Sequence, residues 1–216
     1  MFDNIHLATI AIIAANVLVS IKGFEDRSFL ERYKFSVGGI RSGQKERMLT
    51  SGFLHVDWTH LIFNMLTLYF FANTVISRMG APKFLGIYAI SLAAGSLLAL
   101  FFHREEPYYS AVGASGAVTG VLYAAILLQP TMNLYLFFAV PIPAYIFGIG
   151  YLMYSIYGMK NRLGNIGHTA HFGGAIGGYV TTLIFLPYLF ETETLMVGLL
   201  AIPIIVLFIL QRSGKI

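Results

Sequence analysis

The chain has 216 residues, of which 57% are hydrophobic and only 11% are charged, and its formal net charge is +4. A soluble domain has about 25% charged residues, so this composition excludes an ordinary water-soluble enzyme and predicts a chain immersed in lipid. The absence of cysteine excludes disulfides, thiolate nucleophiles and cysteine-ligated metals, and the small basic excess indicates a membrane surface rather than nucleic acid.

Seven apolar runs are candidates for membrane-crossing helices, because a helix needs about 20 apolar residues to span the hydrocarbon. The runs are continuously apolar, which favours helices over the alternating strands of a membrane barrel. The sequence therefore predicts an all-α fold, a polytopic transmembrane helix bundle. In chain order, the predicted spans cover residues 5–21, 58–77, 82–102, 115–128, 133–157, 169–189 and 194–210.

The connections between these runs are short except for the first. Residues 22–57 carry seven of the fourteen Lys and Arg residues, and a segment of this length is expected to be folded. Prolines interrupt two of the later runs. Pro141 and Pro143 fall inside the fifth run and Pro203 inside the seventh, where each is expected to kink or loosen the helix, because proline lacks the N–H that a helix interior needs.

The fourth run is the shortest. Its 14 residues reach about 21 Å at about 1.5 Å per residue, against a hydrocarbon core of about 30 Å. If its far end reaches one membrane surface, its first residue, Ser115, lies well below the other surface. We therefore expect Ser115 to lie in a depression.

Polar side chains are expensive within lipid, so those inside the spans are candidates for function. The second span carries His60 and Asn64 one helical turn apart, and the fourth and sixth spans carry Ser115 and His171 near their starts. These three spans run in the same direction through the membrane. We therefore expect the four residues to meet at one side of the bundle.

These residue types suit acyl transfer to a serine. Ser115 would attack a carbonyl while the neutral imidazole of His171 takes its proton. The N–H of Ser115 and the side chains of His60 and Asn64 would stabilise the oxyanion. No Asp or Glu lies within a predicted span, so the predicted site is a dyad without an orienting carboxylate, and it requires no cofactor.

Small residues on the same faces would let these helices approach each other. Gly116 and Gly120 form a G-x-x-x-G pair beside the serine, and Gly174 and Gly178 follow the histidine by three and seven residues. Such ridges allow close backbone packing in lipid, so we expect helix-packing roles for all four.

Other interpretations stay open for the single motifs. Taken alone, "GASG" (113–116) is typical of helix packing, and it lacks the last glycine of the G-x-S-x-G turn of soluble hydrolases. A metal site would have to gather histidines from separate segments, although H-E-x-x-H is absent and no span carries a carboxylate ligand. An aspartyl protease needs two aspartates within the membrane, and the spans contain none. The histidines that the metal site just mentioned would need are His55, His60, His168 and His171.

A transporter would hold its substrate near the midplane of the membrane, whereas these polar residues lie near one edge.

Three motifs together resemble those of the rhomboid family of intramembrane serine proteases, of the bacterial type with a six-helix core and one C-terminal helix. "GFLHVDWTHLIFNM" (52–65) is similar to the family's H-x-x-x-N motif, "GASG" (113–116) matches G-x-S-G, and "AHFGGAIGG" (170–178) matches A-H-x-x-G-x-x-x-G. The resemblance covers nearly the whole chain and implies that Ser115 is the nucleophile and His171 the base.

The resemblance also implies an organisation and a biological setting. A catalytic membrane core would cover residues 1–190, and an additional transmembrane helix would cover 191–216. The protein would be a multi-pass protein of the bacterial inner membrane that cleaves single-span membrane proteins in or near their transmembrane segments. Its partners would be these substrates and the lipid bilayer, with no nucleic acid and no metal. The alternative is a non-catalytic relative that binds transmembrane helices; such relatives usually lack the serine or the histidine, and both are present here.

Two positions depart from the family pattern, and the charges conflict with its orientation. Glu46 stands before Arg47 where the family has tryptophan, and Thr119 stands where many members place a tyrosine against the histidine.

The resemblance implies a site that opens outside the cytoplasm and a mobile fifth span. Twelve of the fourteen Lys and Arg residues lie on the side of the site's mouth, which by charge counting would be cytoplasmic. We follow the family orientation, because a long folded loop with interspersed acids is a poor topology signal.

Overall fold

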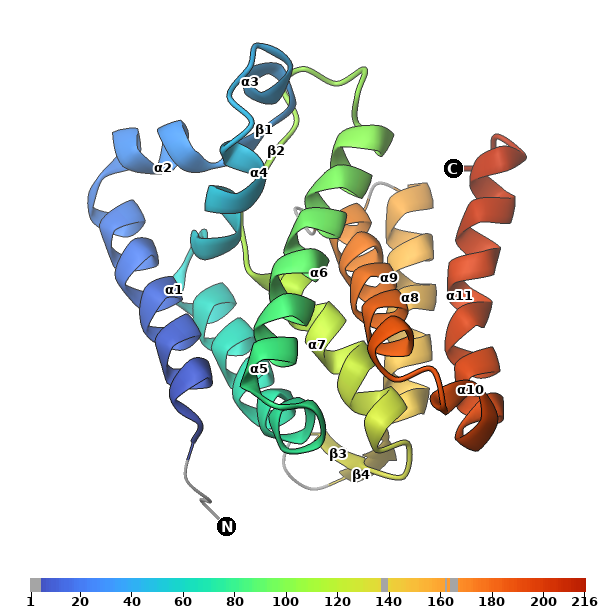
Figure 1. Cartoon of the computed structure of the whole chain (residues 1–216). Coiled ribbons are helices and arrows are strands. Elements are labelled where there is room, and N and C mark those ends of the chain that lie inside the picture. Colours follow the sequence, from blue (N-terminus) through green and yellow to red (C-terminus); the bar gives the residue numbers. More distant parts are fainter. Residues whose placement is uncertain (1–4, 137–139, 162, 164–166) are drawn as a thin grey trace.

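The computed structural model describes residues 5–136, 140–161, 163 and 167–216. Long helices stand side by side, and short elements cap both ends of the bundle (Figure 1). The elements in chain order are α1 (Leu7–Glu25), α2 (Arg27–Tyr33), β1 (Phe35–Ser36), α3 (Val37–Arg41), α4 (Arg47–Thr50), the 3₁₀-helix η1 (Ser51–Phe53), α5 (Trp58–Met79), α6 (Ala81–Phe102), β2 (Ser110–Ala111), α7 (Ser115–Leu128), β3 (Asn133–Leu136), β4 (Val140–Pro143), α8 (Ala144–Asn161), α9 (His168–Phe185), α10 (Leu189–Thr192) and α11 (Thr194–Arg212).

The predicted all-α membrane bundle is confirmed. Among the described helices, α1, α5, α6 and α11 are long and apolar enough to cross a membrane, and α7 is a shorter apolar helix. Helices α8 and α9 have 18 residues each, or about 27 Å. Their mean hydropathy is lower than that of those four helices, because α8 carries several glycines and tyrosines and α9 carries glycines, histidines and threonines. Both nevertheless lie within the bundle, between α7 and α11 (Figure 1).

The fifth predicted span is helical only in its second part. Its first residues form β3 and β4, which pair antiparallel with Asn133 opposite Pro143, and α8 begins at Ala144. Pro141 and Pro143 therefore lie in a strand, and the expected kinked helix was wrong here. A proline offers no N–H and disfavours helical backbone at the preceding residue, so two prolines in close succession suit a short strand better than a helix. Residues 137–139 of the predicted span lie outside the described residues.

The other boundaries differ from the predicted ones by a few residues. Helix α1 continues to Glu25, and α9 ends at Phe185, before the single turn of α10. Helix α11 continues through Pro203, which is buried within it. The fourth span coincides with α7: Gly113, with a positive φ, precedes its start, and Gln129 and Pro130 follow its end.

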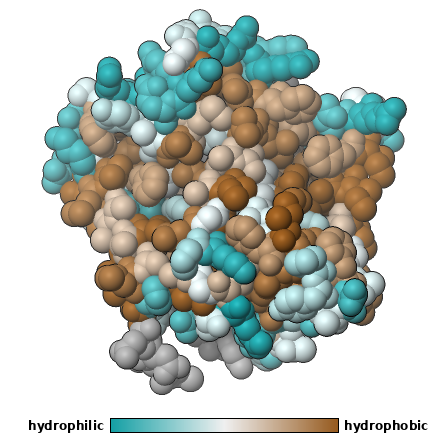
Figure 2. All heavy atoms as spheres, viewed as in Figure 1, coloured by the Kyte–Doolittle hydropathy of each residue, from teal (hydrophilic) through white to brown (hydrophobic). Residues whose placement is uncertain are grey.

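The outer surface of the bundle is apolar. Large side chains such as Leu7, Phe63, Ile184 and Leu195 are each more than half exposed. Hydrophobic residues cover the middle of the face drawn in Figure 2, and hydrophilic residues gather at its upper edge, over α2 and α3. Exposed leucine and phenylalanine are costly in water, so this band is the surface that contacts lipid.

The long segment between α1 and α5 is folded, as its length predicted. Arg47 holds it together, since its guanidinium donates to the carbonyl oxygens of Glu31 at 2.9 Å and Lys34 at 3.0 Å. Strand β1 pairs with β2, placing Phe35 opposite Ala111. The segment is thereby tied to the chain that leads into α7, and it fixes where that helix begins.

Helix α5 begins at a capped turn. The Asp57 carboxylate accepts a hydrogen bond from the His60 N–H at 2.7 Å, which satisfies one of the unpaired donors at the helix start. Asp57→Ala should lower the free energy of unfolding by about 1 kcal/mol, whereas Asp57→Asn, which keeps an acceptor, should be nearly neutral. Equilibrium unfolding in mixed micelles measures both variants, and equal losses would contradict the capping role.

Candidate active site

Ser115 is the first residue of α7, which begins well below the upper end of α6 (Figure 1). Its N–H is one of those that a helix start leaves without an intrahelical partner, and the helix dipole is positive there. Gly113, two residues earlier, has φ +136° and is therefore in a region that other residues rarely adopt. The glycine allows the chain to turn into the helix at this depth.

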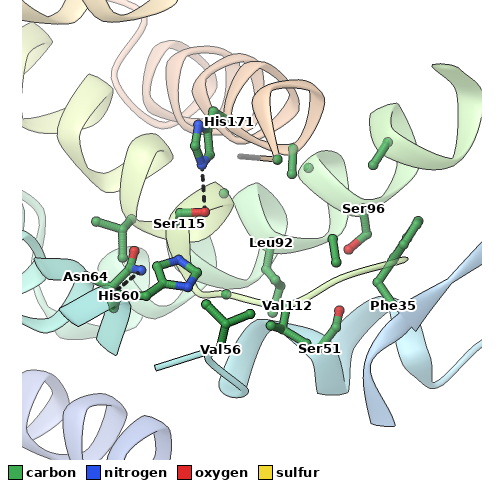
Figure 3. Close-up of a pocket in the computed structure, with 18 of the residues that line it drawn as sticks. Phe35, Ser51, Val56, His60, Asn64, Leu92, Ser96, Val112, Ser115 and His171 are labelled. Carbon is green, nitrogen blue, oxygen red and sulfur yellow. Dashed lines mark hydrogen bonds between the residues drawn. The ribbon is translucent and has the colours of Figure 1, made fainter. Parts of the chain in front are cut away.

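His171 comes from the first turn of α9 and reaches the serine. Its Nε2 lies 2.7 Å from the Ser115 Oγ (Figure 3). The imidazole is only 5% exposed, and Ser115 is half-buried. The hydroxyl and the base predicted from two distant motifs are thus within hydrogen-bonding distance in a sheltered site.

Backbone contact between α7 and α9 makes this approach possible. A Cβ built on Gly174 would collide with the Gly116 carbonyl oxygen, and one built on Gly178 would collide with the carbonyl oxygen of Gly120. The two helices therefore touch along their glycines, at a separation that no other residue permits.

His60 and Asn64 lie beside the serine on α5. The Asn64 Nδ2 donates to the His60 carbonyl oxygen at 3.0 Å. A Cβ on Gly113 would lie 2.7 Å from the His60 Cε1 and 3.6 Å from the Ser115 Oγ, so the ring faces the serine across this glycine (Figure 3). The His60 Nδ1 is buried and has no hydrogen-bond partner within the described part of the chain. All four predicted site residues line one cleft of about 1110 Å³.

Two residues of this site were missed or misassigned by the sequence analysis. The first is His55, considered there only as a metal ligand. Its Nε2 accepts from the Ala114 N–H at 3.4 Å, and its Nδ1 lies 2.8 Å from the Ser20 Oγ. Because Nε2 accepts, the ring hydrogen lies on Nδ1, which donates to the serine. Ser20 in turn donates to the Phe53 carbonyl oxygen. His55 thereby connects α1 to the residue before Ser115.

Burial lowers the pKa of the His55 imidazole from 6.5 to about 3. The folded state prefers the neutral ring, so acid destabilises it. The contribution of His55 to the free energy of unfolding is fully present above pH 6.5. It is lost by about 1.4 kcal/mol per pH unit as the pH falls from 6.5 toward 3. In His55→Gln, the free energy of unfolding should therefore change with pH by about 1.4 kcal/mol per unit less than in the wild type. Unfolding in micelles between pH 7 and 4 measures it. A wild-type slope in His55→Gln would contradict the assignment.

The second missed residue is Tyr151 of α8. Its hydroxyl lies 2.7 Å from the Nδ1 of His171, and the two rings stack with centroids 5.4 Å apart. Thr119 occupies the position where the family resemblance suggested a tyrosine, and its hydroxyl donates to the Ser115 carbonyl oxygen instead. A tyrosine in an apolar helix gives no sequence signal of this contact, because only the packing of α8 on α9 creates it.

The four histidines considered as metal ligands lie as two pairs. The rings of His55 and His60 are 4.9 Å apart, and those of His168 and His171 are 6.3 Å apart. Within residues 5–136, 140–161, 163 and 167–216, no group of three His, Asp or Glu residues has an arrangement that would hold an ion.

Comparisons with known proteins agree with the fold and the motifs. A family model of the Rhomboid domain matches residues 42–188. The RHOMBOID-like protein 12, mitochondrial, of Arabidopsis thaliana is 30% identical over 74% of this chain and 52% of its own length. The Rhomboid protein 1, mitochondrial, of Saccharomyces cerevisiae is 33% identical over 62% of the chain and 40% of its own length. The Rhomboid protease GluP of Bacillus subtilis is 34% identical over 65% of the chain and 26% of its own length.

The matched domain covers more than half of the chain, which therefore belongs to the rhomboid family. It is a multi-pass membrane protein of this family, with the apolar helices that this requires. The chain spans about half the length of the plant relative and less of the other two. Two of these relatives are named as mitochondrial and one is bacterial, so the bacterial inner membrane stays a prediction, as does the division at residue 190.

Proposed function

We propose that this protein is a serine endopeptidase that hydrolyses peptide bonds in or near the transmembrane segments of membrane proteins. The observation that carries the proposal is the 2.7 Å contact between the Ser115 Oγ and the His171 Nε2, at the start of a helix inside an apolar bundle. A hydroxyl beside an imidazole at this distance is the usual arrangement of an activated nucleophile.

The reaction would follow from these two groups. Ser115 Oγ attacks the substrate carbonyl carbon as the His171 Nε2 accepts the hydroxyl proton. The tetrahedral intermediate then collapses, and His171 delivers that proton to the departing amine. A water molecule, activated by the same nitrogen, hydrolyses the acyl-enzyme and regenerates the serine. Each bond that forms or breaks needs one proton transfer, which one imidazole supplies without a cofactor.

The oxyanion would be stabilised by donors already near the serine. The N–H of Ser115 points out of a helix start, and the His60 ring lies across Gly113 from the hydroxyl. Asn64 uses one of its two amide hydrogens on the His60 carbonyl oxygen, leaving the other for substrate. Donors held in place before the reaction stabilise developing charge strongly.

The size and position of the cleft support an extended peptide as substrate. Its volume of about 1110 Å³ exceeds the roughly 300–1,000 Å³ that is usual for small-molecule pockets. Side chains of α5 and α8 line it, including Phe63, Thr67 and Phe147. We infer that a single-span membrane protein presents its helix end from the lipid between α5 and α8, and unwinds there so that a carbonyl reaches Ser115.

The test is cleavage by the purified protein in liposomes that contain one single-span reporter protein. Two fragments should appear, and their summed mass should equal that of the reporter plus one water, with the cut near one end of the reporter helix. A reporter that stays intact but co-purifies with the protein would refute the protease and indicate a non-catalytic helix-binding relative. Mass spectrometry distinguishes the two results.

A further inference from the structure

The hydrogen bond on the far side of the catalytic imidazole comes from a helix outside the three predicted motifs. Tyr151 of α8 places its hydroxyl 2.7 Å from the Nδ1 of His171, whose Nε2 faces Ser115 at 2.7 Å. The three groups form one chain of contacts across α7, α9 and α8. Both nitrogens of the buried ring are therefore engaged, one by the nucleophile and one by the phenol.

The chemistry requires a definite proton arrangement on this ring. Nε2 has to carry a lone pair to accept the Ser115 proton, so the neutral ring must hold its hydrogen on Nδ1. Once Nε2 accepts the proton, Nδ1–H belongs to an imidazolium that is almost completely buried, and an acceptor beside it stabilises that charge. The hydroxyl oxygen of Tyr151 is an acceptor at that position.

No carboxylate fills this position in the described residues. The cleft is lined by two acids, Glu31 and Asp57, and both are engaged elsewhere. Glu31 contacts Lys34 at 2.6 Å, and Asp57 caps α5. The acceptor on Nδ1 is therefore the neutral phenol.

The tyrosine is itself held in place. Phe147, one helical turn earlier on α8, stacks on the Tyr151 ring with a 9° angle between the planes, and the Tyr151 ring stacks on His171 in turn. This column of rings limits the rotation of the phenol. Helix α9 packs mainly against α6 and α7 and more lightly against α8, so the dyad is built by α7 and α9, and α8 adds only the orienting contact.

We propose that Tyr151 is the positioning residue of the dyad, whose hydroxyl accepts the Nδ1–H of His171 and holds the ring with Nε2 toward Ser115. This inference rests on the proposed protease function. The site would then contain a serine, a histidine and a tyrosine in line, with the tyrosine contributed by α8. The base is fully oriented only while α8 packs against α9.

The decisive variant is Tyr151→Phe, which keeps the stacked ring and removes only the hydroxyl. Loss of a hydrogen bond to a charged group predicts a fall in kcat of about 10- to 100-fold with KM unchanged. Tyr157→Phe removes an exposed hydroxyl from the same helix and should keep wild-type kcat. The reporter cleavage assay in liposomes gives both constants. A wild-type kcat in Tyr151→Phe would overturn the proposal.

Nuclear magnetic resonance of ¹⁵N-labelled histidine gives a second readout that does not require activity. Wild-type His171 should show a protonated Nδ1 and an unprotonated Nε2, and Tyr151→Phe should shift the ring toward a mixture of the two tautomers. Unchanged ring-nitrogen shifts in Tyr151→Phe would overturn the proposal, even if kcat fell through altered packing. If the wild type did not cleave the reporter, the protease proposal would fail, and the tautomer shift would still decide whether Tyr151 orients the ring.

Discussion

Ser115→Ala is expected to abolish both cleavage of a single-span reporter and covalent labelling by a fluorophosphonate. Alanine lacks the hydroxyl that would attack the carbonyl or the phosphorus, and removal of a serine nucleophile should lower kcat at least about 10³-fold. His171→Ala should label as weakly as Ser115→Ala, because without the imidazole the Ser115 hydroxyl would keep its proton. The double variant should lose no more kcat than either single variant, since the two groups act as one unit.

The matched control is Ser110→Ala. Ser110 is an exposed serine of β2 that lines the same cleft, five residues before the proposed nucleophile. Its loss should leave labelling and cleavage at wild-type levels, because nothing in the proposed reaction uses its hydroxyl. In-gel fluorescence of the labelled protein compares all variants at equal protein amounts. Equal labelling of wild type and Ser115→Ala would refute Ser115 as the nucleophile.

Among the glycine-to-alanine changes at the glycines that the structure describes, Gly174→Ala should cause the largest loss of stability. The added Cβ would meet the carbonyl oxygen of Gly116, which is backbone and has no rotamer to move to. Overpacking of this kind costs about 3 kcal/mol at the upper end of its usual range. Helix α9 would also have to move away from α7, which carries His171 away from Ser115. We expect both the midpoint of unfolding in micelles and the cleavage rate to fall.

Gly150→Ala is the matched control for that change. Gly150 also lies within a helix, α8, but a Cβ built there meets no atom within 4 Å. Stability should stay the same or rise by up to about 1 kcal/mol, because alanine favours the helix more than glycine does. If the two alanine variants unfolded alike, the glycine contact between α7 and α9 would not be what holds these helices at their distance.

Much of the site could be predicted from the sequence, because its signals are local. The polar residues His60, Ser115 and His171 stand out in apolar runs, and helix counting alone predicts that they share one side of the bundle. The capping role of Asp57 is equally local, because an acceptor just before an apolar run satisfies the N–H groups of the first turn. The end of α7 is also a local signal, because Gln129 and Pro130 follow its apolar run directly.

The segment 133–157 shows where the local signals failed. Its apolar content is that of a span, and the two prolines were expected only to kink a helix. The structure forms a strand pair up to Pro143 and starts α8 after it. Apolar composition reports that a segment is buried or in lipid, but for short runs it does not distinguish a strand from a helix.

By itself, the sequence determined that the chain is a helical membrane bundle of the rhomboid family and that a serine and two histidines approach one side of it. Hydropathy and motif spacing carry that information because each depends only on residues close in the chain. Only the tertiary structure decided which side chains support the site. Tyr151 reaches His171, and His55 holds the backbone before Ser115, through contacts across 20 and 59 positions of the chain. Such contacts depend on how each helix is rotated against its neighbours, and that rotation is determined by packing over the whole bundle.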